Sequence, residues 1–250
     1  MRTVSIKWAI PVAVAAALLA GCGSKDGGTA GSPAPAATSA SPTAVALADK
    51  AGEEILAESR AAIEEAKSFR LKGSVVEDGQ TIAMDLKLNG DAVQGTLSMG
   101  KGQGTVEILA VDGQQFIRPD KKFWDVNGGA GAGDTMAQLM GKKWAKLSTK
   151  DEDLAALFAP VSALGELLKP DGGAVVKGET KKIGAVDAIA LMDSAGAKEK
   201  LWIATTGKPY PVLLESPADG TMAFSDFGKD PGIKTPAAKD VIDFDKLIGN

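Results

Sequence analysis

Residues 81–90 read TIAMDLKLNG, and this stretch decides the fold class. Apolar side chains alternate with polar or small ones over Ile82, Met84, Leu86 and Leu88. A period of two is typical of a β-strand with one apolar face and one solvated face. Asn89-Gly90 closes the stretch with a strong signal for a tight hairpin turn. The sequence therefore predicts an antiparallel sheet that buries one face.

Similar runs extend on both sides, with hairpin signals at Asp78-Gly79, Asp112-Gly113 and Asp219-Gly220. We expect strands at 69–77, 80–89, 92–99, 103–111, 114–119 and 122–126, then at 173–181, 184–193, 198–205, 210–216 and 220–227. A last short strand or turn carries Val241, Ile242 and Phe244. Consecutive strands joined by tight turns predict antiparallel meanders.

Helical periodicity appears before the first meander and between the two. Val45 to Ser68 has an apolar stripe, including Leu47 and Ile55, opposite charged residues. In the middle, we expect a Gly-rich mobile loop at 127–134, a short helix capped by Asp134 or Thr135 that stops at Gly141, a strand within 143–148, and a helix at 151–169 divided at Pro160. Helices on one face of an antiparallel sheet define an α+β fold.

The first residues predict export. Arg2 and Lys7 form a short basic start, and the apolar run Ala9 to Leu18 that follows is too short to span a bilayer, which needs about 20 residues. Leu19-Ala20-Gly21-Cys22 follows and resembles a bacterial lipobox. We expect residues 1–21 to be a lipoprotein signal peptide and Cys22, the only cysteine, to carry the lipid.

Composition changes sharply after the cysteine. Residues 22–44 are mostly Gly, Ser, Ala, Pro and Thr, which cannot bury enough apolar surface to offset ordering entropy. We interpret them as a flexible tether to one domain, residues 45–250. Without a second hydrophobic span, the Cys22 lipid is the expected anchor to the outer face of the cell membrane.

Composition also excludes several functions. Histidine is absent, which removes Ser-His-Asp and Cys-His catalysis and the usual zinc sites. Without Arg2 and Lys7, 26 basic residues face 32 acidic ones, a net charge of −6, so no nucleic-acid footprint is expected. The Gly-rich segment 100–104 lies between strands, unlike a phosphate loop. We expect no enzyme activity, metal or cofactor.

Three local motifs and their order resemble the LppX/LprG-type lipoproteins of actinobacteria, whose fold is similar to that of the LolA and LolB carriers. The motifs are Val111-Asp112-Gly113 followed by Phe116-Ile117, then Lys143-Trp144-Ala145-Lys146-Leu147, then Leu201-Trp202-Ile203-Ala204 with Gly207-Lys208-Pro209-Tyr210-Pro211. The resemblance covers about residues 45–245. It implies a large curved antiparallel sheet, a half-barrel, with helices packed against its concave face around an apolar cavity for lipid.

Two interpretations of the apolar stripes remain open at this point, a filled core and the wall of a lipid cavity. The expected lipid-binding residues are Met84, Leu86, Leu88, Leu97, Met99, Val106, Ile108, Leu157 and Phe158. The cavity predicts a carrier of a lipid, glycolipid or other lipophilic molecule at the cell envelope. The filled core predicts a lipoprotein that binds an envelope protein partner.

Overall fold

The computed structural model of the chain describes residues 47–77, 79–148, 152–158, 174–194 and 198–248. The signal peptide, Cys22 and the tether predicted above lie outside these residues. So do residues 159–173, which include all of the predicted central helix beyond Pro160. Residues 43–250 form one compact unit, and its fold is described below.

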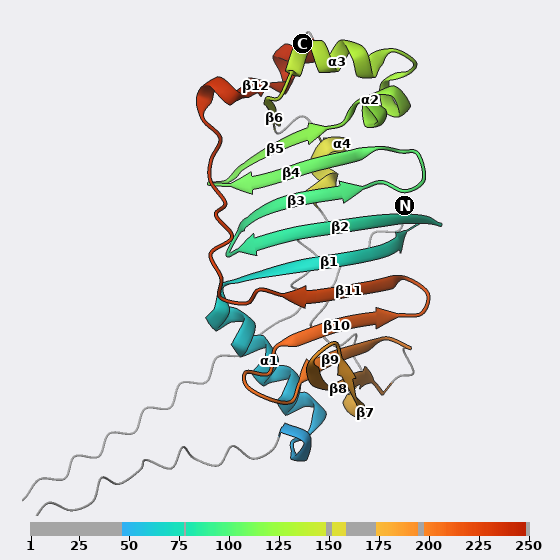
Figure 1. The fold of residues 1–250 in the computed structure, drawn as a ribbon, viewed down its shortest axis with the longest axis vertical. Coiled ribbons are helices and arrows are strands. Elements are labelled where there is room, and N and C mark those ends of the chain that lie inside the picture. Colours follow the sequence, from blue (N-terminus) through green and yellow to red (C-terminus); the bar gives the residue numbers. More distant parts are fainter. Residues whose placement is uncertain (1–46, 78, 149–151, 159–173, 195–197, 249–250) are drawn as a thin grey trace, which may run out of the picture. The chain divides into compact units, whose positions relative to one another are not determined.

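A single 12-stranded sheet organises this unit (Figure 1). Its strands are β1 (Ser68–Glu77), β2 (Gln80–Asn89), β3 (Ala92–Ser98), β4 (Thr105–Val111), β5 (Gln114–Pro119), β6 (Trp144–Lys146), β7 (Val175–Ile183), β8 (Val186–Asp193), β9 (Lys200–Ala204), β10 (Pro211–Ser216), β11 (Gly220–Ser225) and β12 (Val241–Asp243). The order is β12-β6-β5-β4-β3-β2-β1-β11-β10-β9-β8-β7. The sheet is curved. It is also open, because its two edge strands, β12 and β7, do not pair with each other.

The predicted meanders are confirmed and meet at one seam. Strands β1 to β5 pair consecutively, as do β7 to β11, and β1 pairs with β11 to join them. The turn between β4 and β5 shows how local sequence fixes the register of a strand pair. Asp112 and Gly113 both have positive φ, 52° and 69°, as the tightest hairpin turns require. The antiparallel sheet predicted from residues 81–90 is therefore present, as the predicted α+β class requires.

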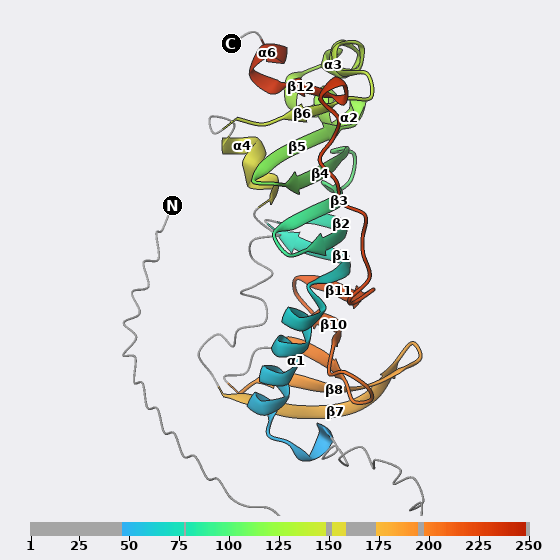
Figure 2. The same ribbon diagram turned by 90° about the vertical axis from the view of Figure 1, so that its left-hand side faces the viewer.

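Helices cover parts of the sheet. They are α1 (Gly52–Ala66), α2 (Lys121–Gly128), α3 (Ala132–Met140), α4 (Glu152–Ala155) and α6 (Phe244–Ile248), with 3₁₀ turns at Leu47–Asp49, Ala156–Phe158 and Ala238–Asp240. Helices α1 and α4 lie on the same side of the sheet (Figure 2). Throughout the described ranges, every helix falls short of the length and apolar character needed to cross a bilayer.

One strand prediction is wrong. Residues 122–126 belong to helix α2, not to a sixth meander strand. The cause is local, because the Asp120 side chain accepts a hydrogen bond from the Phe123 backbone N–H at 2.8 Å and caps the helix. Asn127 then donates to the Phe123 carbonyl at 2.7 Å, one turn back. These polar contacts decide the structure of a segment whose apolar residues are too few to show a period.

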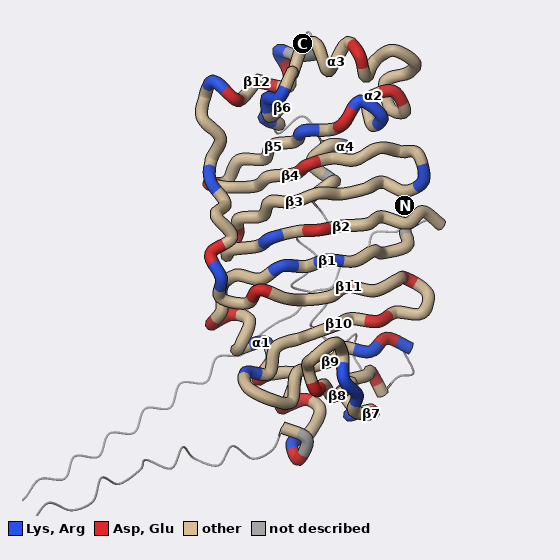
Figure 3. Tube along the Cα trace, viewed as in Figure 1, with Lys and Arg blue, Asp and Glu red and all other residues tan. Residues whose placement is uncertain are grey.

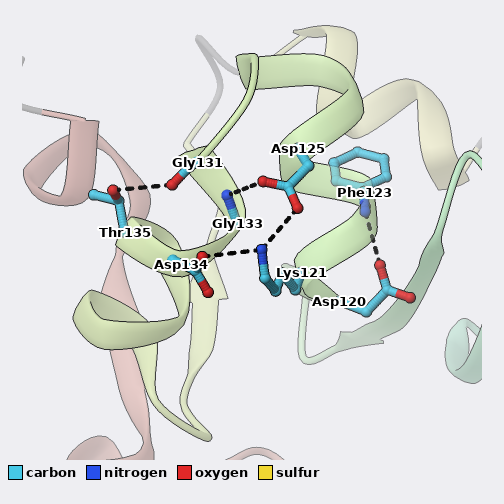
Figure 4. Close-up of polar contacts among 8 residues, drawn as sticks. All are labelled: Asp120, Lys121, Phe123, Asp125, Gly131, Gly133, Asp134 and Thr135. Carbon is cyan, nitrogen blue, oxygen red and sulfur yellow. Dashed lines mark hydrogen bonds and ion pairs between the residues drawn. The ribbon is translucent and has the colours of Figure 1, made fainter.

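The expected Gly-rich loop at 127–134 is also corrected. Its first residues end α2, and α3 begins at Ala132, so only a tight turn separates the helices. Gly133 lets them approach, since its N–H donates to Asp125 at 2.9 Å and an added Cβ would lie 2.4 Å from the Lys121 carbonyl oxygen (Figure 4). Gly131 is the N-cap rather than Asp134 or Thr135, whereas Gly141 ends the helix as predicted.

A C-terminal strap, residues 226–240, creates a pairing that the sequence did not predict. It runs from β11 along the strand ends and brings β12 beside β6, in the only parallel pair of the described sheet (Figure 1). Gly228 donates to the Ser68 carbonyl at 2.9 Å, and Thr235 hydrogen-bonds Asp112 in the β4–β5 turn. The strap therefore ties the seam between the meanders to the far end of the sheet.

Candidate functional site

The concave side of the sheet, here called the inner face, carries a continuous apolar surface. Its buried side chains form one cluster, the inner cluster, that reaches from Ile189 of β8 across the seam to Ala145 of β6. Helix α1 contributes Ile55 and Leu56 to it, and Phe158 contributes from the 3₁₀ turn after α4. This apolar surface extends across the inner face from β6 to β8.

Cross-strand register arranges the inner cluster in rows. Met84, Leu97 and Val106 are successive partners across β2, β3 and β4. The next row contains Leu71, Leu86, Gly95, Ile108 and Ile117. Directly opposite residues have Cβ atoms about 5 Å apart, so the side chains of each row form a contact line, which Gly95 interrupts in the second row. Extended apolar chains lying across the strands would meet such lines along their whole length.

The structure brings together every lipid-binding candidate in the folded part of the chain. Those that are buried in the inner cluster are Met84, Leu86, Leu88, Leu97, Val106, Ile108 and Phe158. Met99 and Leu157 are half-buried and pack against the same cluster. Both a filled core and a lipid cavity bury these side chains, so their burial agrees with either interpretation.

Several inner-face residues were not among the candidates. Leu191, Leu201, Leu214 and Met222 continue the Met84 row through the second meander, in successive register. Phe224 extends the Leu86 row. Their alternation is present in the sequence, but the β1–β11 pairing that makes both meanders one surface is a long-range contact without a local signal.

Two glycines shape this surface. Gly73 in β1 and Gly95 in β3 lie in the inner rows, as the partners of Met84 and Leu86. A Cβ on Gly73 would lie 2.0 Å from the Thr221 carbonyl oxygen, and one on Gly95 would lie 2.1 Å from that of Asp85. Glycine at both positions therefore permits backbone approaches that curve the sheet toward the inner face.

A groove of about 760 Å³ opens at the strand ends beside α4. The hairpin residues Asp91 and Asp112 line it, together with Gln115. Ala110 and Leu147 add apolar wall next to the inner cluster. The volume falls in the range of small-molecule sites, roughly 300–1,000 Å³. A groove with an apolar wall and a polar rim suits a ligand that has both kinds of surface.

The opposite, outer face is organised differently. Lys72, Asp85, Thr96, Glu107 and Arg118 are successive cross-strand partners that form a polar row over β1 to β5 (Figure 3). Arg118 pairs with Glu107 at 2.6 Å. Its guanidinium carbon lies 4.4 Å from the ring centroid of Trp144. The outer face is therefore solvated along this row.

Arg70 strengthens the polar row through a two-point contact with Asp85. Its Nε and Nη2 donate to the two carboxylate oxygens at 2.7 and 2.6 Å. The hydrogen bond from Arg70 lowers the pKa of Asp85 despite an opposing effect of burial. Asp85 is therefore held ionised at a central position of the outer face.

Smaller apolar clusters lie at either end of the outer face. An outer cluster at one end contains Leu109, Phe116 and Trp144, with Ile233 of the strap packed against it. At the other end Trp202 is fully buried, and its Nε1 donates to Glu215 at 2.6 Å. Burial opposes ionisation of Glu215, but hydrogen bonds from Trp202 and Lys181 outweigh it and lower its pKa. Neighbouring side chains cover both clusters. Ile233 packs on the first, and the Lys181 ammonium lies 4.0 Å from the ring centroid of Trp202 in the second.

The fold and the inner face place the chain in a class of α+β proteins in which an open curved sheet holds an apolar surface beneath helices. The sequence matches no protein-family model and no curated protein. Among solved structures, it is similar to LprF from Mycobacterium bovis, at 13% identity and a TM-score of 0.48, over 75% of this chain and 97% of LprF. Similarity to LprF is what the resemblance to LppX/LprG-type lipoproteins led us to expect.

Weaker similarities extend to other proteins. MucB matches at 15% identity and a TM-score of 0.30, over 77% of this chain and 62% of MucB. A DUF1329 family protein from Desulfovibrio piger matches at 9% identity and a TM-score of 0.27, over 74% of this chain and 95% of its own. All three TM-scores lie below 0.5.

Proposed function

We propose that the protein binds and carries lipid or another lipophilic molecule against the inner face of its sheet. The observation that carries this proposal is the continuity of the apolar rows from β8 to β5, next to a groove with a polar rim. The rows would contact acyl chains, and the rim would contact a head group. No bond has to form or break, so the absence of histidine does not affect this activity.

The hydrophobic effect supplies the driving force. Each CH₂ group that moves from water to an apolar site contributes about 0.8 kcal/mol. A chain of about 16 carbons therefore gains roughly 12 kcal/mol before the costs of association and ordering. Partial contact with the inner face would therefore still be enough to hold a lipid that has left the membrane and would otherwise be exposed to water.

Membrane attachment is the second part of the proposal. A lipid on Cys22 would hold the domain at the outer face of the cell membrane. The tether beyond Cys22, about 22 residues long, would span roughly 25 Å as a coil and keep the domain close to the bilayer without embedding it. The domain could then reach lipids in the membrane surface while it remains attached through the tether.

The decisive experiment combines lipid content with stability. Organic extracts of the purified protein are analysed by mass spectrometry, for the wild type and for Leu86→Trp and Leu97→Trp. If these residues line a lipid site, the larger side chains displace lipid and change the free energy of unfolding little. In a filled core, the same overpacking costs about 1–3 kcal/mol. Phe116→Trp, in the outer cluster, is the matched control that should leave lipid content unchanged.

The alternative is an envelope lipoprotein that binds a protein partner. Exposed apolar side chains on α2 and α3 favour it, since Val126 is 41% exposed and Leu139 is 52% exposed. A wild-type extract without lipid, together with strong destabilisation by Leu97→Trp, would reject the carrier and support this alternative.

A further inference from the structure

Helix α1 presents one polar side chain on its buried face. Ser59 has a relative exposure of 0%, between apolar or small neighbours such as Ile55, Leu56 and Ala62. Among the described residues, its Oγ has no hydrogen-bond partner. A buried hydroxyl without a partner is destabilising and uncommon in folded proteins. Serines inside helices often bond the carbonyl one turn back, but Ser59 does not.

The helical positions give the direction of the Ser59 side chain. Residues three and four apart share a helix face, which groups Ser59 with Leu56 and Ile55. Both belong to the inner cluster. At the start of the helix, an added Cβ on Gly52 would lie 2.4 Å from the Val175 carbonyl oxygen, so α1 packs closely on β7. Ser59 therefore lies on the face of α1 that packs against the inner cluster.

Ser68 shows that this fold does satisfy buried hydroxyls. It is the other buried serine in the described ranges, with a relative exposure of 5%. Its Oγ donates to the backbone carbonyl of Lys229 in the strap at 2.8 Å. The two serines differ in their partners. Ser68 bonds backbone, whereas the Ser59 hydroxyl, on the helix face that carries Ile55 and Leu56, has no partner among the described residues.

We propose that the Ser59 hydroxyl hydrogen-bonds an oxygen of the bound lipid, so that the preferred ligands carry an ester carbonyl or a chain hydroxyl that reaches α1. This inference rests on the proposed carrier function and makes it more specific. An apolar chain alone would leave the hydroxyl unpaired. A lipid with an oxygen at this point satisfies the hydroxyl, and the apolar rows bury the rest of the chain.

Stability measurements give the first test, with Ser59→Ala made in the full chain. In delipidated protein, the melting temperature should rise, because the variant removes an unpaired buried hydroxyl and alanine favours helix. In lipid-loaded protein it should fall relative to the wild type, because a hydrogen bond is lost. Ser68→Ala is the matched control and should lower the melting temperature in both states. The same sign for Ser59→Ala in both states would overturn the proposal.

Binding measurements identify the source of the oxygen. The probes are dipalmitoylglycerol, its ether analogue dihexadecylglycerol, a mid-chain hydroxystearic acid and stearic acid. One lost hydrogen bond corresponds to about a three- to tenfold weaker affinity. Loss confined to dipalmitoylglycerol indicates an ester carbonyl, and loss confined to hydroxystearic acid indicates a chain hydroxyl. Equal affinity of variant and wild type for every probe would overturn this inference alone, whereas a wild type that binds none would overturn the carrier function as well.

Discussion

Ile108 and Leu109 are consecutive residues of β4 that are equally buried and belong to opposite faces of the sheet. Ile108 has a relative exposure of 0% and lies in the inner cluster, opposite Ile117. Leu109 has a relative exposure of 1% and lies in the outer cluster, opposite Phe116. Substitutions at these two residues therefore probe the two faces at one position of one strand. They can distinguish an effect on packing from an effect on ligand binding.

Truncation of this pair is the first prediction. Leu109→Ala should lower the free energy of unfolding by about 2–5 kcal/mol, as large-to-small changes do in packed clusters. Ile108→Ala should cost less in lipid-loaded protein, because lipid occupies the vacated volume. Mass spectrometry of bound lipid should then show longer or bulkier chains only for Ile108→Ala. Equal losses of stability with unchanged lipid for both variants would indicate a filled inner cluster.

The sequence specifies this two-faced arrangement only in part. Strict alternation and hairpin residues predicted a strand at 80–89, the same residues that form β2, because both signals are local. Residues 122–126 were wrongly predicted as a strand, since the Asp120 cap decides their structure through polar contacts. The β1–β11 seam and the parallel β12 depend on contacts between segments far apart in the chain, for which one sequence contains no pattern.

The candidate site was predictable to a similar extent. Alternation identified Met84 and Leu86 as residues of one face, and the register confirms that they are in adjacent rows with Leu97 and Ile108. The special position of Ser59 was not predictable, because its unpaired state depends on how closely α1 packs on the sheet. The alternation of apolar and polar residues could predict the polarity of each face but not the distances between elements.

A second prediction concerns the glycines of the inner rows. Gly73→Ala and Gly95→Ala should destabilise the protein strongly, because an added Cβ would meet neighbouring backbone at 2.0 and 2.1 Å. Backbone cannot give way as a flexible side chain does. Gly102→Ala is the control, since its φ of 78° strains alanine by about 1–2 kcal/mol but nothing lies within 4 Å of the new Cβ. Chemical denaturation should rank both inner-row variants well below this control.

Anchoring gives a third prediction. Cys22→Ala should abolish lipid attachment, because the chain has no other thiol. The protein should then accumulate as unprocessed precursor or lose stable membrane retention. Metabolic labelling with a radioactive fatty acid, followed by membrane fractionation, measures both effects. Labelling equal to that of the wild type would contradict the assignment of Cys22 as the lipidated residue.

The last prediction concerns acid stability and the outer face. The pKa of Asp85 is lowered in the folded protein, chiefly by its hydrogen bond with Arg70, so the interaction stabilises the fold only while the carboxylate is ionised. Its contribution should be complete above about pH 4, near the pKa of about 3.9 of an unfolded aspartate. It should decline as the pH falls through the lower folded pKa.

Asp85→Asn tests this directly. Its free energy of unfolding should lie below that of the wild type by a constant amount near neutral pH, and the gap should narrow in acid. Because the pair is partly exposed, the gap at neutral pH is expected to be modest, within about 1 kcal/mol. In an Arg70→Met background, the same substitution should lose most of its pH dependence, since only Lys72, at 3.4 Å, remains as a charged partner. A gap that keeps its size down to strongly acid pH would show that Asp85 stabilises the sheet by packing rather than by charge.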